Sequence, residues 1–124
     1  MTVTTKARGD EAEQQALDYV LRQGLTLVQR NYRVARGPHA RGGEVDLILR
    51  ERDGTLVFAE VRSRRAGSGH GGAGASVGRT KQRRLVLAAQ HYLRQFAVLP
   101  PCRFDVLAID GGRIEWLKAA FDAS

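Results

Sequence analysis

Two acidic residues stand inside apolar stretches that otherwise favour β-strands. Asp46 lies in the 43–48 segment, GEVDLI, and Glu60 lies in the 57–62 segment, VFAEVR. Acidic residues are depleted in strands, and a carboxylate placed among apolar side chains is costly unless it is paired or binds a metal. The pattern therefore favours carboxylate chemistry. The alternative is an outward-facing ion pair at a sheet edge, such as Glu60 with an arginine.

The loop between the two stretches decides whether the carboxylates meet. If only Asp53 and Gly54 form the loop, residue 46 pairs with 61 and the acids face opposite sides. If the loop is 52–54, with Gly54 in the left-handed conformation, Asp46 lies beside Glu60 and Glu44 opposes Arg62. Opposed like charges are destabilising, and a bridging divalent cation would relieve the repulsion. Oxygen ligands of this kind suit Mg²⁺ or Mn²⁺, which can activate water for attack on a phosphate.

Strict strand alternation sorts the first stretch into two faces. One face carries Glu44, Asp46 and Ile48, and the other carries Val45, Leu47 and Leu49.

A third acid, Glu13, precedes an apolar stripe at helical spacing. The stripe consists of Ala16, Leu17, Val20 and Leu21, which follow Glu13 by three, four, seven and eight residues. These offsets share one helix face, so Glu13 is expected to point toward the edge of the sheet that the stripe covers. The alternative is that Glu13 ends the stripe in solvent, near the positive end of the helix dipole.

The elements that must position these acids follow from periodicity and turn signals. We expect helices over 7–22 and 77–96, and strands over 25–34, 44–50, 55–63, 103–109 and 113–117. The order is αβββαββ in one domain spanning 1–124, and a crossover helix returning to a meander gives an α/β fold with a mixed sheet flanked by helices. The Gly-, Ala- and Ser-rich segment 66–76 is expected to be a flexible loop.

The charge of the chain points to a polyanionic partner. Its 124 residues carry 20 Lys and Arg against 13 Asp and Glu, a net charge of +7. Nucleic acid is the first expectation for such a surface. Arg79, Lys81, Arg83 and Arg84 crowd the start of the second helix, where phosphate contacts are favoured over a merely solvated face.

Other features narrow the setting. No apolar run is long enough to span a membrane, and the N-terminus has no secretory pattern, so no membrane partner is expected. The single cysteine, Cys102, cannot form an internal disulfide, which favours the cytoplasm. The 67–72 segment, GSGHGG, matches a dinucleotide-binding pattern but lacks the parallel βαβ unit that the pattern requires. A mobile arm over the substrate and a tolerated surface insertion are the two readings of this loop.

The ordered set of these motifs resembles the YraN family, small bacterial predicted endonucleases related to Holliday junction resolvases. The resemblance runs from Glu13 through the 31–33 segment, NYR, both acidic strands, Val77 with Lys81, the 103–106 segment, RFDV, and Ala120 with Phe121. It implies a restriction-endonuclease-like fold and a PD-(D/E)xK site in which Asp46 and Glu60 bind the metal and Glu13 assists. Arg62 stands where the family usually has the catalytic Lys.

Three functions remain open at this point. The first is a metal-dependent endonuclease that acts on DNA, including branched DNA. The second is a nucleic-acid-binding module on the same fold without turnover, which the change from Lys to Arg62 keeps open. The third is a partner in a larger DNA-processing assembly. A homodimer is expected by analogy with junction resolvases alone.

Overall fold

Two helices and five strands follow one another in the expected order, αβββαββ. The structure is a computed structural model and describes residues 5–35, 42–64 and 77–123. The elements are α1 (Thr5–Arg22), β1 (Thr26–Val34), β2 (Gly43–Arg50), β3 (Leu56–Arg64), α2 (Arg79–Leu93), β4 (Cys102–Asp110) and β5 (Arg113–Phe121). The 66–76 segment, with its GSGHGG motif, lies outside the described residues.

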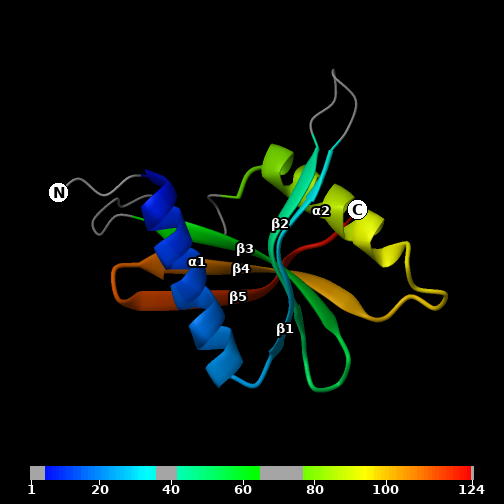
Figure 1. Cartoon of the computed structure of the whole chain (residues 1–124), viewed down its shortest axis with the longest axis horizontal. Helices are drawn as coiled ribbons and strands as arrows, with labels where there is room; N and C mark the ends of the chain where they lie inside the picture. Colours follow the sequence, from blue (N-terminus) through cyan, green and yellow to red (C-terminus); the bar gives the residue numbers. More distant parts are fainter. Residues whose placement is uncertain (1–4, 36–41, 65–76, 124) are drawn as a thin grey trace.

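The five strands form one mixed sheet in the order β1-β2-β3-β4-β5. Three neighbouring pairs are antiparallel, and β3 and β4 are parallel. A parallel pair needs a crossover connection, and α2 lies within it. Figure 1 shows β1 and β2 running across the line of β3, β4 and β5, which reflects the strong twist of the sheet. The expected mixed α/β architecture is confirmed.

Each helix covers its own apolar cluster on the sheet. The α1 cluster includes Ala16, Leu17 and Val20 with Leu47, Leu49, Val57, Ala59 and Leu107. The α2 cluster includes Leu85, Ala88 and Tyr92 with Ile48, Phe58 and Phe104. Strands buried on both faces read as continuous apolar runs. This explains the apolar residues at the centres of β2, β3 and β4, against which Asp46, Glu60 and Asp105 stand out.

The hairpin between β2 and β3 has the longer of the two expected loops. Glu51 N donates to Thr55 O at 2.9 Å, and Gly54 N donates to Glu51 O at 3.0 Å. Gly54 has a φ of 93°, a conformation that glycine adopts without steric cost. Leu47 therefore pairs with Ala59. The next positions along this register are Asp46 and Glu60.

The two strands separate just beyond the Leu47 and Ala59 pair, which is the last one between β2 and β3. The expected alternation is wrong at Val45. This residue joins Ile48 in the α2 cluster instead of sharing a face of the strand with Leu47. The expected contact between Glu44 and Arg62 is also wrong, because Glu44 instead pairs with Arg33 and Arg84. The start of β2 is not paired with β3 and packs against α2 instead. A cleft therefore opens between the two strands.

The bounds of the second helix and of the last strand also differ from expectation. The second helix is shorter, Arg79–Leu93, because Val77 precedes it as a buried residue and accepts a hydrogen bond from the Gln82 side chain. The last strand is longer and reaches Phe121, across a register shift between Phe104 and Val106.

Within the described residues, no helix has both the length and the hydropathy needed to cross a membrane.

Gly43 allows the backbone of β2 to lie against the backbone of α2. A Cβ atom at residue 43 would lie 2.7 Å from Ala88 N and 2.8 Å from Arg84 O. Gly43→Ala should therefore force α2 away from the sheet and lower the free energy of unfolding by about 1–3 kcal/mol. Urea unfolding measures this loss.

Gly112→Ala is the matched control for this substitution. A Cβ atom at residue 112 would meet nothing within 4 Å. An exposed change of this kind should alter stability by less than about 0.5 kcal/mol. Equal stability of the two variants would show that α2 does not depend on the close approach at Gly43.

Candidate active site

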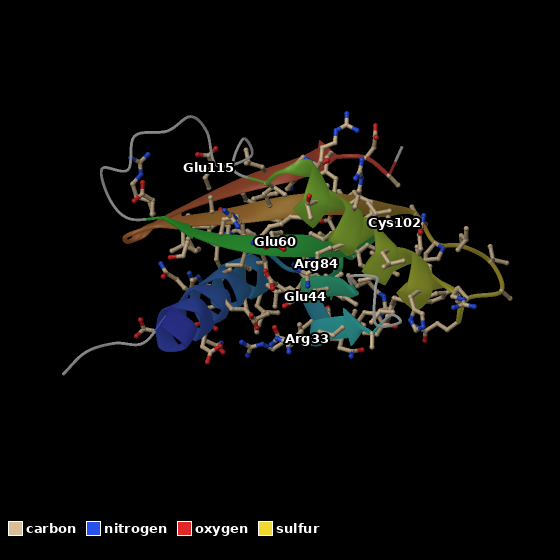
Figure 2. The ribbon with its side chains drawn as sticks, turned by 90° about the horizontal axis from the view of Figure 1, so that it is seen from above. Arg33, Glu44, Glu60, Arg84, Cys102 and Glu115 are labelled. Atoms are coloured by element: carbon tan, nitrogen blue, oxygen red, sulfur yellow. The ribbon has the colours of Figure 1, made fainter. Side chains whose placement is uncertain are left out.

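A cleft of about 360 Å³ lies where β2 separates from β3, between the two helices. Its acidic lining residues are Asp10, Glu13, Glu44, Asp46 and Glu60, and its basic ones are Arg33, Lys81 and Arg84. Figure 2 shows Glu44, Glu60 and Arg84 gathered between α1 and α2, while Cys102 and Glu115 lie apart from them. The fold thus brings Glu13, Asp46 and Glu60 to one cavity from three different elements.

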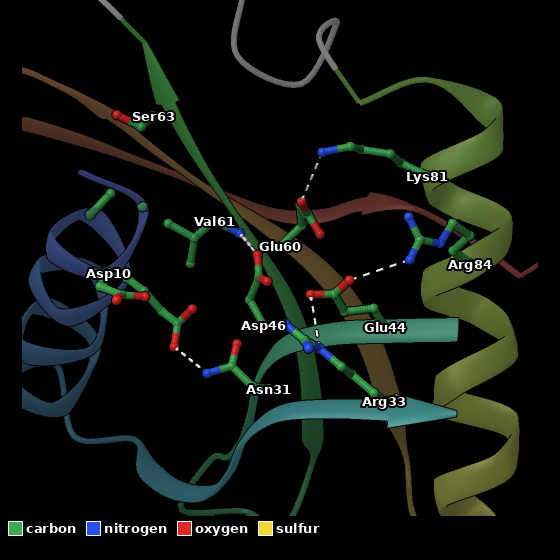
Figure 3. Close-up of a pocket in the computed structure, with 13 residues that line it drawn as sticks. Asp10, Asn31, Arg33, Glu44, Asp46, Glu60, Val61, Ser63, Lys81 and Arg84 are labelled. Carbon is green, nitrogen blue, oxygen red and sulfur yellow. Dashed lines mark hydrogen bonds and ion pairs between the residues drawn. The ribbon is translucent and has the colours of Figure 1, made fainter. Parts of the chain in front are cut away.

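The Asp46 carboxylate reaches across the gap to β3. Its Oδ2 accepts a hydrogen bond from Val61 N at 2.8 Å, where the β2–β3 ladder has already ended (Figure 3). Burial raises the pKa of Asp46 from 3.8 to about 7, and the charge of Glu60 is the next largest cause. The Val61 N–H lowers this pKa only in part. Asp46 is therefore a carboxylate held in an environment that opposes its charge.

Glu60 lies in the same environment and is only 13% exposed at its side chain. Burial raises its pKa, while the positive charges of Lys81 and Arg62 lower it. Lys81 Nζ lies 3.6 Å from Glu60 Oε1. Two neighbouring carboxyl groups with raised pKa values attract a proton or a cation, which is a frequent property of functional sites.

Glu13 also lines the cleft and is held in place by side chains of β1. Its Oε1 accepts hydrogen bonds from Arg30 Nε at 3.2 Å, Arg30 Nη2 at 3.1 Å and Asn31 Nδ2 at 3.1 Å. The residue is buried, so the expectation that it points to the sheet edge is right and the solvent alternative is wrong. Asn31 has a φ of 52° within β1. Strained backbone of this kind tends to collect at functional sites.

Sequence reasoning missed Arg30 and Asn31 as functional candidates. The signal that could have found Asn31 is its residue type. Asn adopts the left-handed conformation more readily than other non-glycine residues, and it is depleted in strands.

The four basic residues expected to contact phosphate divide into two pairs. Lys81 and Arg84 line the cleft, whereas Arg79 and Arg83 are exposed and lie outside it. Arg84 is fixed by Glu44, at 3.3 Å, and by Gly42 O, at 3.2 Å. Arg62 is half-buried, and the described residues that line the cleft do not include it.

The oxygen-rich donor set of the cleft fits a hard divalent cation such as Mg²⁺ or Mn²⁺. Burial raises the pKa of Asp46 and of Glu60, so a bound cation would favour the ionised form of both. Among the described residues, no three His, Cys, Asp or Glu side chains already form a metal-binding group. Mg²⁺ is commonly held by one or two carboxylates together with water and substrate phosphates. Asp46 and Glu60 match that smaller requirement.

Comparison with known proteins places the cleft inside a shared sequence region. A family model described as uncharacterised protein family UPF0102 matches residues 12–109, which include Glu13, Asp46, Glu60 and Lys81. A UPF0102 protein of Methylibium petroleiphilum is 66% identical over 122 residues, covering 98% of this chain and 99% of the relative. A UPF0102 protein of an Acidovorax species is 59% identical over 121 residues, covering 98% and 89%.

A solved structure, that of SSO0001, is similar with a TM-score of 0.44 and 19% identity. The match covers 94% of this chain, which spans about half (52%) of the other. The sequence relatives carry the assignment. The chain belongs to the UPF0102 family.

Proposed function

We propose that this protein is a divalent-metal-dependent endonuclease that hydrolyses phosphodiester bonds in DNA. The observation that supports this proposal is the convergence of Glu13, Asp46 and Glu60 in one cleft, beside Lys81 and Arg84. Carboxylates that bind a metal, next to cations that bind phosphate, are the groups that phosphodiester hydrolysis needs. The resemblance to PD-(D/E)xK nucleases supports the same reading.

The residues of the cleft divide the work of this reaction. Asp46 and Glu60 would hold Mg²⁺ or Mn²⁺, which supplies Lewis acidity and lowers the pKa of water. Glu13, fixed by Arg30 and Asn31, adds a third carboxyl group to the lining of the same cleft. In the reaction, a water oxygen bonds to phosphorus and the bond from phosphorus to the leaving sugar oxygen breaks. Water releases one proton to solvent and the leaving oxygen gains one, giving a terminal phosphate and a free hydroxyl.

The second candidate function is DNA binding without turnover. The observation that favours it is Arg62, which the resemblance places at the usual Lys position and which does not line the cleft. Its guanidinium offers a forked donor set for phosphate but cannot act as a general base. A protein that depended on a titratable group at this position would bind DNA and leave it intact.

Cleavage of a panel of DNA substrates separates the two candidates. Linear, flapped and four-way DNA are incubated with Mg²⁺ or Mn²⁺ and with wild-type protein or the Asp46→Asn variant. Cleavage by the wild type alone supports the nuclease. Binding without cleavage of any substrate by the wild type selects the second candidate. Equal cleavage by both proteins identifies a contaminating nuclease and removes the catalytic claim.

DNA affinity should fall steeply with salt because the protein's Lys and Arg side chains displace counterions from phosphates. Arg79 and Arg83 are the residues to test, since both are exposed and lie outside the cleft. The Arg79→Ala/Arg83→Ala double variant should reduce the slope of log affinity against log salt concentration by about 1–2. Fluorescence anisotropy at several salt concentrations measures this slope.

The matched control for this experiment is Arg113→Ala/Lys118→Ala. It removes the same charge from β5, away from α2. An equal loss of slope in both double variants would mean that net charge, and not the start of α2, sets DNA affinity.

A further inference from the structure

Lys81 occupies the place in the cleft that the sequence pattern assigns to Arg62. Its ammonium lies 3.6 Å from the Glu60 carboxylate, and Figure 3 shows it extending from α2 toward that group. Arg62 follows Glu60 by two residues on β3, yet it is not among the described residues that line the cleft. The half-buried Arg62 guanidinium lowers the pKa of Glu60 through its positive charge, and it does so less than Lys81.

We propose that Lys81, and not Arg62, is the catalytic cation that contacts the reacting phosphate. This inference rests on the proposed nuclease function and names the residue that completes its site. The role is to stabilise the negative charge that develops on phosphate oxygens as water attacks. Arg62 then tunes Glu60 from outside the cleft and does not touch the substrate.

Among the described residues, the other two cations of the cleft pair with Glu44 and not with a proposed metal-binding carboxylate. Arg84 donates to Gly42 O and pairs with Glu44, which joins α2 to β2. Arg33 pairs with the other oxygen of Glu44 at 3.6 Å. Lys81 instead pairs with Glu60, in the same cleft as Asp46.

The contact between Lys81 and Glu60 is suited to exchange. The Lys81 side chain is 47% exposed, and an ion pair with an exposed partner is weak. A compact ammonium on a flexible stem can leave Glu60 for a phosphate oxygen without disturbing the helix. The base of that stem is fixed, because the close approach at Gly43 holds α2 against β2. Lys81 thus combines an anchored helix position with a movable charge.

The test compares cleavage rate with DNA affinity in a set of single variants. Single-turnover cleavage at saturating DNA is measured for wild type, Lys81→Ala, Lys81→Arg, Arg62→Ala and Lys118→Ala. Lys118 is the matched control, because it is a lysine of β5 that stacks over Trp116 and does not line the cleft. Lys81→Ala should lower the rate about 100- to 1,000-fold, the effect of removing one group that stabilises transition-state charge. Lys81→Arg should restore part of it.

The DNA dissociation constant should change less than about threefold in Lys81→Ala, because one phosphate contact contributes little to total affinity. Arg62→Ala should lose less than tenfold in rate, and Lys118→Ala should match wild type. A larger loss in Arg62→Ala than in Lys81→Ala would overturn the inference. So would a Lys81→Ala effect that appears only as weaker DNA binding.

Metal binding supplies a readout that does not depend on cleavage. The Lys81 ammonium and a divalent cation compete for Glu60 Oε1. The Mn²⁺ concentration at which Tm rises should therefore be several-fold lower in Lys81→Ala than in wild type. Lys118→Ala should not change it, and an unchanged requirement in Lys81→Ala contradicts the competition. If wild type cuts and Lys81→Ala cuts equally, this inference fails while the proposed function stands. If wild type does not cut, both fail.

Discussion

Replacing Asp46 with Asn should abolish cleavage and at the same time make the protein more stable at pH 8. The amide oxygen can still accept the hydrogen bond from Val61 N, so the local geometry is kept while the charge is lost. When catalytic groups act as a unit, removing one of them removes most of the effect of all of them. Loss of the Asp46 carboxylate should therefore lower the cleavage rate by about 1,000-fold or more. Mn²⁺ should raise the Tm of wild type and leave that of the variant nearly unchanged.

The stability gain follows from the pKa of Asp46. The carboxyl titrates at about 7 in the folded protein against 3.8 as its ordinary value. The folded state therefore binds the proton more tightly than the unfolded state, and the wild type loses stability as pH rises from about 4 to about 7. The Asn side chain does not titrate and escapes this loss. The difference at pH 8 should be on the order of 2 kcal/mol, after discounting the shift for partial exposure.

Thermal melts at pH 4 and pH 8 measure both parts of this prediction. At pH 4 the wild type and Asp46→Asn should melt alike, and at pH 8 the variant should melt several degrees higher. Asp110→Asn, at the exposed end of β4, is the matched control and should show no pH-dependent gain. A variant that is less stable than wild type at pH 8 would show that the charge of Asp46 is already balanced in the cleft.

Removing the carboxylate of Asp105 should have the largest effect on folding. Asp105 is fully buried, and its oxygens accept hydrogen bonds from Ala119 N at 2.9 Å, Trp116 Nε1 at 2.8 Å and Arg103 Nε at 3.0 Å. Ala119 has a φ of 51°, so this carboxylate also holds an unfavourable backbone turn in β5. Asp105→Ala leaves these donors unpaired and Arg103 without its buried counter-charge. The expected loss is about 3–5 kcal/mol, a large fraction of the stability of a domain this size.

Urea unfolding of three variants tests the origin of this loss. Asp105→Ala should be severely destabilised, and the exposed Asp110→Asn should resemble wild type. Asp105→Ala/Arg103→Met should recover part of the loss, because the double change removes the half-buried cation together with its fully buried counter-charge. Arg103 also pairs with Glu51, so recovery will be incomplete. A loss below about 1 kcal/mol in Asp105→Ala would mean that water replaces the carboxylate without cost.

The sequence by itself determined the elements and their order, and it limited the pairing of the two strand acids to two registers. Turn chemistry at Gly54 offered two registers, and the longer loop is the one observed, which places position 46 opposite position 60. The apolar stripe after Glu13 predicted that this acid points to the sheet edge, with solvent as the alternative, and the structure shows it buried. These features were predictable because each depends on residues close together in the chain, where backbone preference and side-chain period act directly.

Only the tertiary structure decided how the site is completed. The separation of β2 from β3, which turns Val45 toward α2 and lets Asp46 reach Val61 N, depends on the packing of α2 at Gly43. The choice of Lys81 over Arg62 as the cation nearest Glu60 depends on the phase and depth of a helix that begins well after β3. A row of basic residues predicts a charged helix face, but which member enters the cleft is set by long-range contacts. Sequence periodicity carries no information about such contacts between distant elements, because they arise only when the two helices dock on opposite faces of the sheet.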